Sequence, residues 1–173
     1  MKIINQNSSI CFVITLLVFS RIIPHPPNFT PIISIAILGG ILFHSFTLTI
    51  IVFLSSMFIS DLIIGLYPGM IFTYIALILI GTIYYFIFNK ITYKNLIFHS
   101  LCGSFIFYLI TNFFVWTNSD LYEKTIDGLI KCYLLAIPFF SNTLLSTIFF
   151  SFLTFACVDR IKNYFYKTEK NIV

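Results

Sequence analysis

The chain has 173 residues, of which 59% are hydrophobic and only 9% are charged, and its formal net charge at pH 7 is +4. Its mean hydropathy is +1.00, so a soluble fold of this size could not shield its apolar side chains from water. These values exclude a soluble protein and predict an integral membrane protein.

Uninterrupted apolar runs predict an all-α fold, with about six transmembrane helices in one bundle. The runs cover residues 10–23, 32–43, 46–64, 70–88, 96–116 and 142–158. A membrane-spanning helix needs about 20 residues, so the first two runs require flanking polar residues to complete them. The apolar start has no small-residue cleavage pattern and predicts a retained helix. We therefore expect one transmembrane domain, residues 1–158, followed by a short basic cytoplasmic tail, residues 159–173.

The second and third runs are separated only by His44 and Ser45. So short a connection predicts a tight helical hairpin. A single kinked helix is the alternative.

The distribution of Lys and Arg predicts the orientation of the bundle. An even number of spans puts both termini on one side, and we expect that side to be the cytoplasm. The inner side then carries Lys2, Lys90, Lys94, Arg160, Lys162, Lys167 and Lys170, and the outer side carries Arg21, Lys124 and Lys131. The basic residues thus act as topological anchors at the lipid surface, and we expect no nucleic-acid partner.

All six prolines fall on the predicted outer side, where we expect the function. The first outer segment, residues 21–31, contains four of them, which predicts a stiff re-entering loop. His25 stands between two prolines and Asn28 follows, so both are candidates for ligand binding from a rigid scaffold. The alternative for His25 is a hydrogen bond that anchors the loop.

The second outer segment, residues 60–70, places Asp61 near the end of a membrane helix. A carboxylate there is costly, so it should face a cavity or a cation, and Arg21 is the nearest candidate. An ion pair that only fastens two helix ends is the alternative. Tyr67 is a further ligand candidate, although an interfacial aromatic belt also explains it.

The third outer segment, residues 117–140, contains Asp120 and Glu123 at the spacing of a helix-capping pair. The charge pattern that follows predicts a short interfacial helix before the last span, lying as a lid and ending at Pro138. The last span is expected to begin at Ser141 and Asn142.

Asn112 and Trp116 are four residues apart on one face of the fifth span, beneath the predicted lid. Helix packing and the interfacial belt are the alternatives for these two ligand candidates. The four cysteines show no metal or disulfide spacing, and no catalytic or phosphate-binding motif is present, so we expect neither a metal site nor an enzyme. Cys132, on the outer side, is a remote candidate for a thiolate ligand.

Four motifs, in chain order RIIPHPPNFTPI, SDLIIG, TNFFVW and AIPFFSN, resemble an uncharacterised family of small bacterial six-helix membrane proteins, over about Arg21 to Phe155. That family is similar to the substrate-binding S-components of energy-coupling-factor vitamin transporters, most of all to the solitary cobalamin-specific type. The resemblance implies a bacterial inner-membrane protein that holds its ligand with the first, third and fifth loops. The positions it places in or beside the pocket are His25, Asn28, Asp61, Asn112, Trp116 and, more weakly, Asn142.

Two departures from that pattern bear on the expected partners. Related sequences often carry a His where this chain has Tyr67, which weakens the case for a metal-centred ligand. The small-residue motif through which many S-components bind an energising module is not visible in the first span.

We therefore expect a carrier for a vitamin or related micronutrient, with cobalamin or another corrinoid as the first candidate and no bound cofactor of its own. A non-transport membrane scaffold of similar six-helix topology is the alternative function. An intramembrane enzyme is a third class, for which the sequence shows no nucleophile and base pairing.

Overall fold

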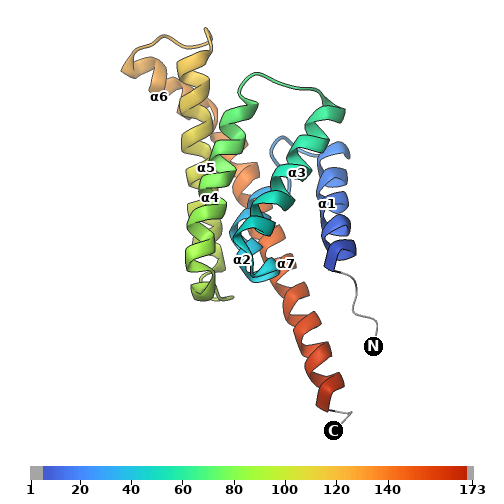
Figure 1. Cartoon of the computed structure of the whole chain (residues 1–173). Coiled ribbons are helices and arrows are strands. Elements are labelled where there is room, and N and C mark those ends of the chain that lie inside the picture. Colours follow the sequence, from blue (N-terminus) through green and yellow to red (C-terminus); the bar gives the residue numbers. More distant parts are fainter. Residues whose placement is uncertain (1–5, 171–173) are drawn as a thin grey trace.

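The structure is a computed structural model that describes residues 6–170, and in that range every regular element is helical (Figure 1). The elements are α1 (Gln6–Ile22), α2 (Ile32–Phe43), α3 (Phe46–Ile64), α4 (Met70–Ile87), the short 3₁₀ turn η1 (Phe88–Lys90), α5 (Leu96–Asn118), α6 (Ile126–Leu135) and α7 (Ile137–Lys170). The predicted all-α fold is confirmed.

Four helices are long and apolar enough to cross a membrane: α3, α4 with η1, α5, and the first part of α7 up to Arg160. Helices α1 and α2 are apolar but shorter. Large hydrophobic side chains cover the outward surfaces of the bundle, and Phe86 is 78% exposed. A surface of this kind suits lipid rather than water, so the chain is a membrane protein by the length and composition of its helices.

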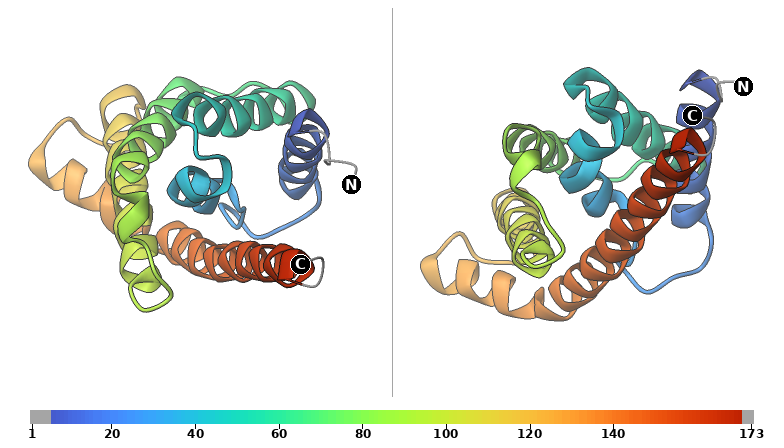
Figure 2. Two further views of the ribbon diagram at one scale, coloured as in Figure 1. Left: turned by 60° about the horizontal axis from the view of Figure 1, so that its bottom comes forward. Right: turned by 90° about the horizontal axis from the view of Figure 1, so that it is seen from below.

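Helix α2 is the centre of the molecule. It packs against α3, α4, α5 and α7, and residues 32–40 are buried on all sides (Figure 2). At twelve residues it is only about 18 Å long, less than the hydrocarbon core of a bilayer. Protein surrounds residues 32–40, so this part of the short helix does not rely on lipid to cover its surface.

A tight hairpin joins α2 to α3. His44 adopts the left-handed conformation, with φ 50°, at the end of α2. Ser45 caps α3, because its hydroxyl accepts a hydrogen bond from the backbone N–H of Leu48 at 3.3 Å. The two helices pack against each other, so the predicted hairpin is confirmed and the single kinked helix is wrong.

Helix α1 lies at the edge of the bundle and packs mainly against α3. Both termini lie at the same end of the molecule, and the connections after α1 and α3 lie at the opposite end together with α6 (Figure 1). The three segments that the sequence assigned to the outer side therefore gather at one end of the bundle.

The region around α6 differs from the prediction in two respects. Its N-cap is Thr125, whose hydroxyl accepts from the N–H of Gly128 at 3.2 Å, so the predicted capping pair at Asp120 and Glu123 is wrong. Pro138 does not end α6 but lies in the first turn of α7, where a missing N–H costs no helical hydrogen bond.

Helix α7 is also longer than expected. It begins at Ile137, before the predicted Ser141, and runs for 34 residues. Residues 159–170 of the predicted tail therefore continue the helix. The rest of that tail, and the first five residues of the chain, lie outside the described range.

Candidate ligand-binding site

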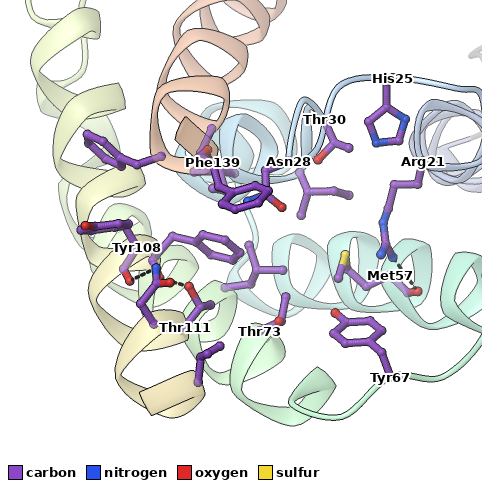
Figure 3. Close-up of a pocket in the computed structure, with 18 of the residues that line it drawn as sticks. Arg21, His25, Asn28, Thr30, Met57, Tyr67, Thr73, Tyr108, Thr111 and Phe139 are labelled. Carbon is purple, nitrogen blue, oxygen red and sulfur yellow. Dashed lines mark hydrogen bonds between the residues drawn. The ribbon is translucent and has the colours of Figure 1, made fainter. Parts of the chain in front are cut away.

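One cavity of about 480 Å³ opens at the end of the bundle opposite the termini. Segments far apart in the sequence form it: the end of α1, the proline loop, the connection between α3 and α4, the C-terminal half of α5 and the first turns of α7 (Figure 3). Its volume lies in the range of pockets that hold drug-sized molecules. Its uncharged polar lining consists mainly of Asn28, Thr30, Thr73, Thr111, Asn112 and Thr143.

The proline loop has a defined turn that places Asn28 at the cavity. Asn28 has a positive φ of 63°, follows Pro27, and is spanned by a hydrogen bond from the N–H of Phe29 to the carbonyl of Pro26 at 3.0 Å. This is the arrangement of a type II turn, for which Pro and then Asn are suited. The carbonyl of Asn28 also accepts from the hydroxyl of Ser146 at 3.3 Å, which ties the loop to α7.

His25 both anchors the loop and lines the cavity. Its Nδ1 lies 2.6 Å from the carbonyl oxygen of Ile23, and because a carbonyl can only accept, Nδ1 carries the proton and donates. The loop-anchoring hydrogen bond, which was the alternative for His25, is therefore present. The ring is one of the groups around the cavity (Figure 3).

Arg21 and Asp61 form an ion pair at the wall of the cavity. Nη2 of Arg21 lies 2.6 Å from Oδ1 of Asp61, while Nη1 donates to the carbonyl of Met57 at 3.1 Å and to the hydroxyl of Ser60. The hydroxyl of Tyr74 donates to the other carboxylate oxygen, Oδ2, at 2.6 Å. Oδ1 has no aligned hydrogen bond besides its ion contact. The predicted pairing of Asp61 with Arg21 is confirmed.

The positive member of the ion pair faces the cavity and the negative member does not. Arg21 lines the cavity, whereas Asp61 is completely buried behind it and does not. No Asp or Glu lines the cavity within the described part of the chain, whose ionisable lining otherwise consists of the His25 imidazole and the phenols of Tyr67 and Tyr108. The cavity wall near α1 therefore carries the positive end of the pair.

Tyr67 and Asn112 also line the cavity, as expected of ligand candidates. Tyr67 lies in the connection between α3 and α4, and burial raises the pKa of its phenol above the usual value, which keeps it neutral at pH 7. The amide nitrogen of Asn112 donates to the carbonyl of Tyr108 at 2.8 Å. Its amide oxygen accepts no hydrogen bond from the described part of the chain.

Three predicted site residues do not line the cavity. Asp61 stands behind Arg21, as described. The indole nitrogen of Trp116 donates to the carbonyl of Glu123 at 2.9 Å and so fastens the segment before α6. Asn142 is half-buried on α7.

Helix α6 is fastened to α5 beside the cavity. The hydroxyl of Tyr108 donates to the carbonyl of Tyr133 at 2.6 Å, and the hydroxyl of Tyr133 donates to the carbonyl of Leu109 at 2.8 Å. None of the cavity lining comes from α6, so the predicted lid is not confirmed. Cys132 is buried in this contact, and burial raises the pKa of its thiol, which disfavours the thiolate proposed from the sequence.

Several lining residues gave no signal in the sequence. Thr111 and Thr143 each donate a hydrogen bond to a carbonyl four residues earlier in their own helix, as membrane threonines often do regardless of function. Phe139 is one of 22 phenylalanines, and in so Phe-rich a chain its position is not distinctive. Within the described part of the chain, no group of three or more His, Cys, Asp or Glu is arranged to hold a metal ion.

The family model that matches this chain covers residues 1–169, so the chain belongs to DUF6580, a family of unknown function. Comparison with the curated proteins gave no match. Comparison with the solved structures gave none either.

Proposed function

We propose that this member of the DUF6580 family is a membrane carrier that binds a vitamin or related micronutrient in the cavity. The observation that carries the proposal is the convergence of the proline loop, the α3–α4 connection, α5 and α7 on one polar and aromatic cavity. Apolar pockets with a few convergent polar groups are the usual form of small-molecule sites. Delivery would follow from reorientation of the bundle, as the resemblance to S-components implies.

In this proposal the chain has six spans, with α1 and α2 counted, and lies in the bacterial inner membrane with both termini in the cytoplasm. Support comes from the common end of the two termini (Figure 1) and from the connection between α4 and α5 at that end, which carries Lys90 and Lys94. Basic residues favour the cytoplasmic side. The cavity then opens to the outside.

The size of the cavity bears on which micronutrient binds. About 480 Å³ suits a ligand of ordinary drug size. A corrinoid has a macrocycle, several amide side chains and a nucleotide loop, so cobalamin would need the outer segments to move apart. A smaller vitamin fits the cavity as it stands.

Purification from cells grown in complete medium, followed by mass spectrometry of copurifying small molecules, tests the proposal. We expect a bound micronutrient, or binding when the empty protein is offered a vitamin panel. A protein that stays empty in both experiments would contradict it. Copurification of an energising transporter module would extend it.

A membrane scaffold is the second candidate function. The observation that favours it is α7, which at 34 residues is about 51 Å long and extends beyond the other helices at the terminal end (Figure 1). An extended helix offers a docking surface to another protein. A scaffold would retain its partners when the cavity is blocked, whereas a carrier would lose transport.

A further inference from the structure

We propose that the ligand of this cavity carries a carboxylate, which binds Arg21, on a compact body that is partly apolar. This inference rests on the proposed function and names the chemical class of the ligand.

The charge of the lining selects against a cationic ligand. Arg21 and His25 are the basic groups at the cavity, and no carboxylate lines it in the described part of the chain. Asp61 balances Arg21 but is 0% exposed and stands behind it. A ligand in the cavity therefore meets the cation of the pair before its anion.

The Arg21 side chain is held in place, and among the described residues no hydrogen bond forms from its Nε. Nη1 is bound by the carbonyl of Met57 and the hydroxyl of Ser60, and Nη2 contacts Asp61. A guanidinium has further donors on Nε and Nη2. A planar fork of this kind binds the two oxygens of a carboxylate well, and its fixed position lowers the entropy cost of binding.

A carboxylate fits this site better than a phosphate. Arg21 is a single, already paired positive charge, and a phosphate at neutral pH carries up to two negative charges with three acceptor oxygens. Phosphate sites usually supply several backbone or cationic donors. One guanidinium with one neighbouring imidazole matches a single negative charge.

The remaining lining residues indicate which chemical groups the body of the ligand carries. Phe107, Phe139 and Phe140 provide apolar surface on the side of α5 and α7. Within the described residues the amide oxygen of Asn112 has no hydrogen-bond donor, so we expect a donor such as a ring N–H or a hydroxyl on the ligand at the end away from Arg21.

Asp61 then competes with the carboxylate of the ligand for the Arg21 guanidinium. Both carboxylates interact with one guanidinium, so the negative charge of Asp61 weakens the attraction that Arg21 exerts on an anion. Asp61→Asn keeps the shape of the side chain and removes this competing charge. We expect it to raise the affinity for a carboxylate ligand, which a merely structural role of Asp61 would not do.

The test compares acids with their uncharged analogues on the full chain in lipid nanodiscs. The probes are nicotinic acid with nicotinamide, biotin with biotinamide, and pantothenate with pantothenol, measured by calorimetry. We expect at least one acid to bind at least about tenfold more tightly than its uncharged analogue. Equal or tighter binding of the uncharged member in every pair that binds would overturn the carboxylate inference and leave the carrier proposal standing.

Two variants complete the test. Asp61→Asn should bind the preferred acid about tenfold more tightly, and Arg21→Gln combined with Asp61→Asn, which leaves no buried charge unpaired, should bind acid and analogue alike. An acid preference that persists in the double variant would overturn the inference. Failure of every probe to bind the wild-type protein would also overturn it. If, in addition, nothing copurifies and no vitamin binds, the proposed function fails with it.

Discussion

Nη2 of Arg21, at the end of α1, lies 2.6 Å from Oδ1 of Asp61, near the end of α3. This ion pair joins a peripheral helix to the wall of the cavity. Helix α1 packs mainly against α3, so the pair fastens the proline loop at its origin. Its cation lines the cavity and its anion is buried. One contact thus bears on stability and on the ligand choice that we propose.

Asp61→Ala should destabilise the protein strongly. It leaves the Arg21 guanidinium and the Tyr74 hydroxyl without their carboxylate partner, and breaking a buried pair from one side costs about 3–5 kcal/mol. Thermal denaturation in detergent measures the loss. The combined variant Arg21→Gln and Asp61→Asn should be less destabilised, and a double variant at least as unstable as Asp61→Ala would contradict this account.

Gly39→Ala should loosen the α2–α3 hairpin. A Cβ at this position would lie 2.2 Å from Cγ2 of Thr49, whose buried side chain is fixed by a hydrogen bond to the carbonyl of Ser45. Overpacking of this kind costs about 1–3 kcal/mol. Adding Thr49→Ala to the variant should recover part of the stability, with Thr49→Ala alone as the control. No recovery would show that the clash is not the cause.

His25→Ala and His25→Asn separate the loop-anchoring role of this histidine from its proposed role in ligand binding. Alanine removes the Nδ1 hydrogen bond to Ile23 together with Nε2, whereas asparagine can keep an N–H donor near the position of Nδ1. We expect both to weaken ligand binding and only alanine to lower the melting temperature. Undiminished affinity in both variants would exclude His25 from the binding site.

The proposed orientation predicts which loops a membrane-impermeant thiol reagent reaches in intact cells. In a variant with Cys11, Cys102, Cys132 and Cys157 replaced by alanine, a single cysteine at Asp120 should be labelled from outside. A single cysteine at Lys94 should be labelled only after lysis. Both positions are exposed in the structure, so protection would come from the membrane. Labelling of the Lys94 position from outside, with the Asp120 position labelled only after lysis, would show that the chain has the opposite orientation in the membrane.

The elements best predicted from the sequence are those fixed by hydrophobicity and by isolated charge. Long apolar runs gave the helices, and two polar residues between runs gave the hairpin at His44. The pairing of Arg21 with Asp61 was predictable because each charge is costly in a membrane helix and few partners were in reach.

The parts that the sequence misplaced depend on local competition or on tertiary packing. Thr125 and Asp120 are both good cap residues, and the structure uses Thr125. Pro138 suits the end of one helix and the start of the next equally well, and α7 takes it. The position of α6 follows from the Tyr108 and Tyr133 hydrogen bonds to α5, which amphipathic periodicity does not encode.

Calorimetric titration of the purified full chain with the vitamin panel, alongside mass spectrometry of what copurifies, tests most directly whether the cavity binds a micronutrient. The account predicts that one small carboxylated micronutrient binds with a single site per chain, and that filling the cavity by Thr111→Trp abolishes the binding while the protein stays folded. Binding that survives Thr111→Trp unchanged, or no binding of any panel member to the wild-type protein, would contradict it.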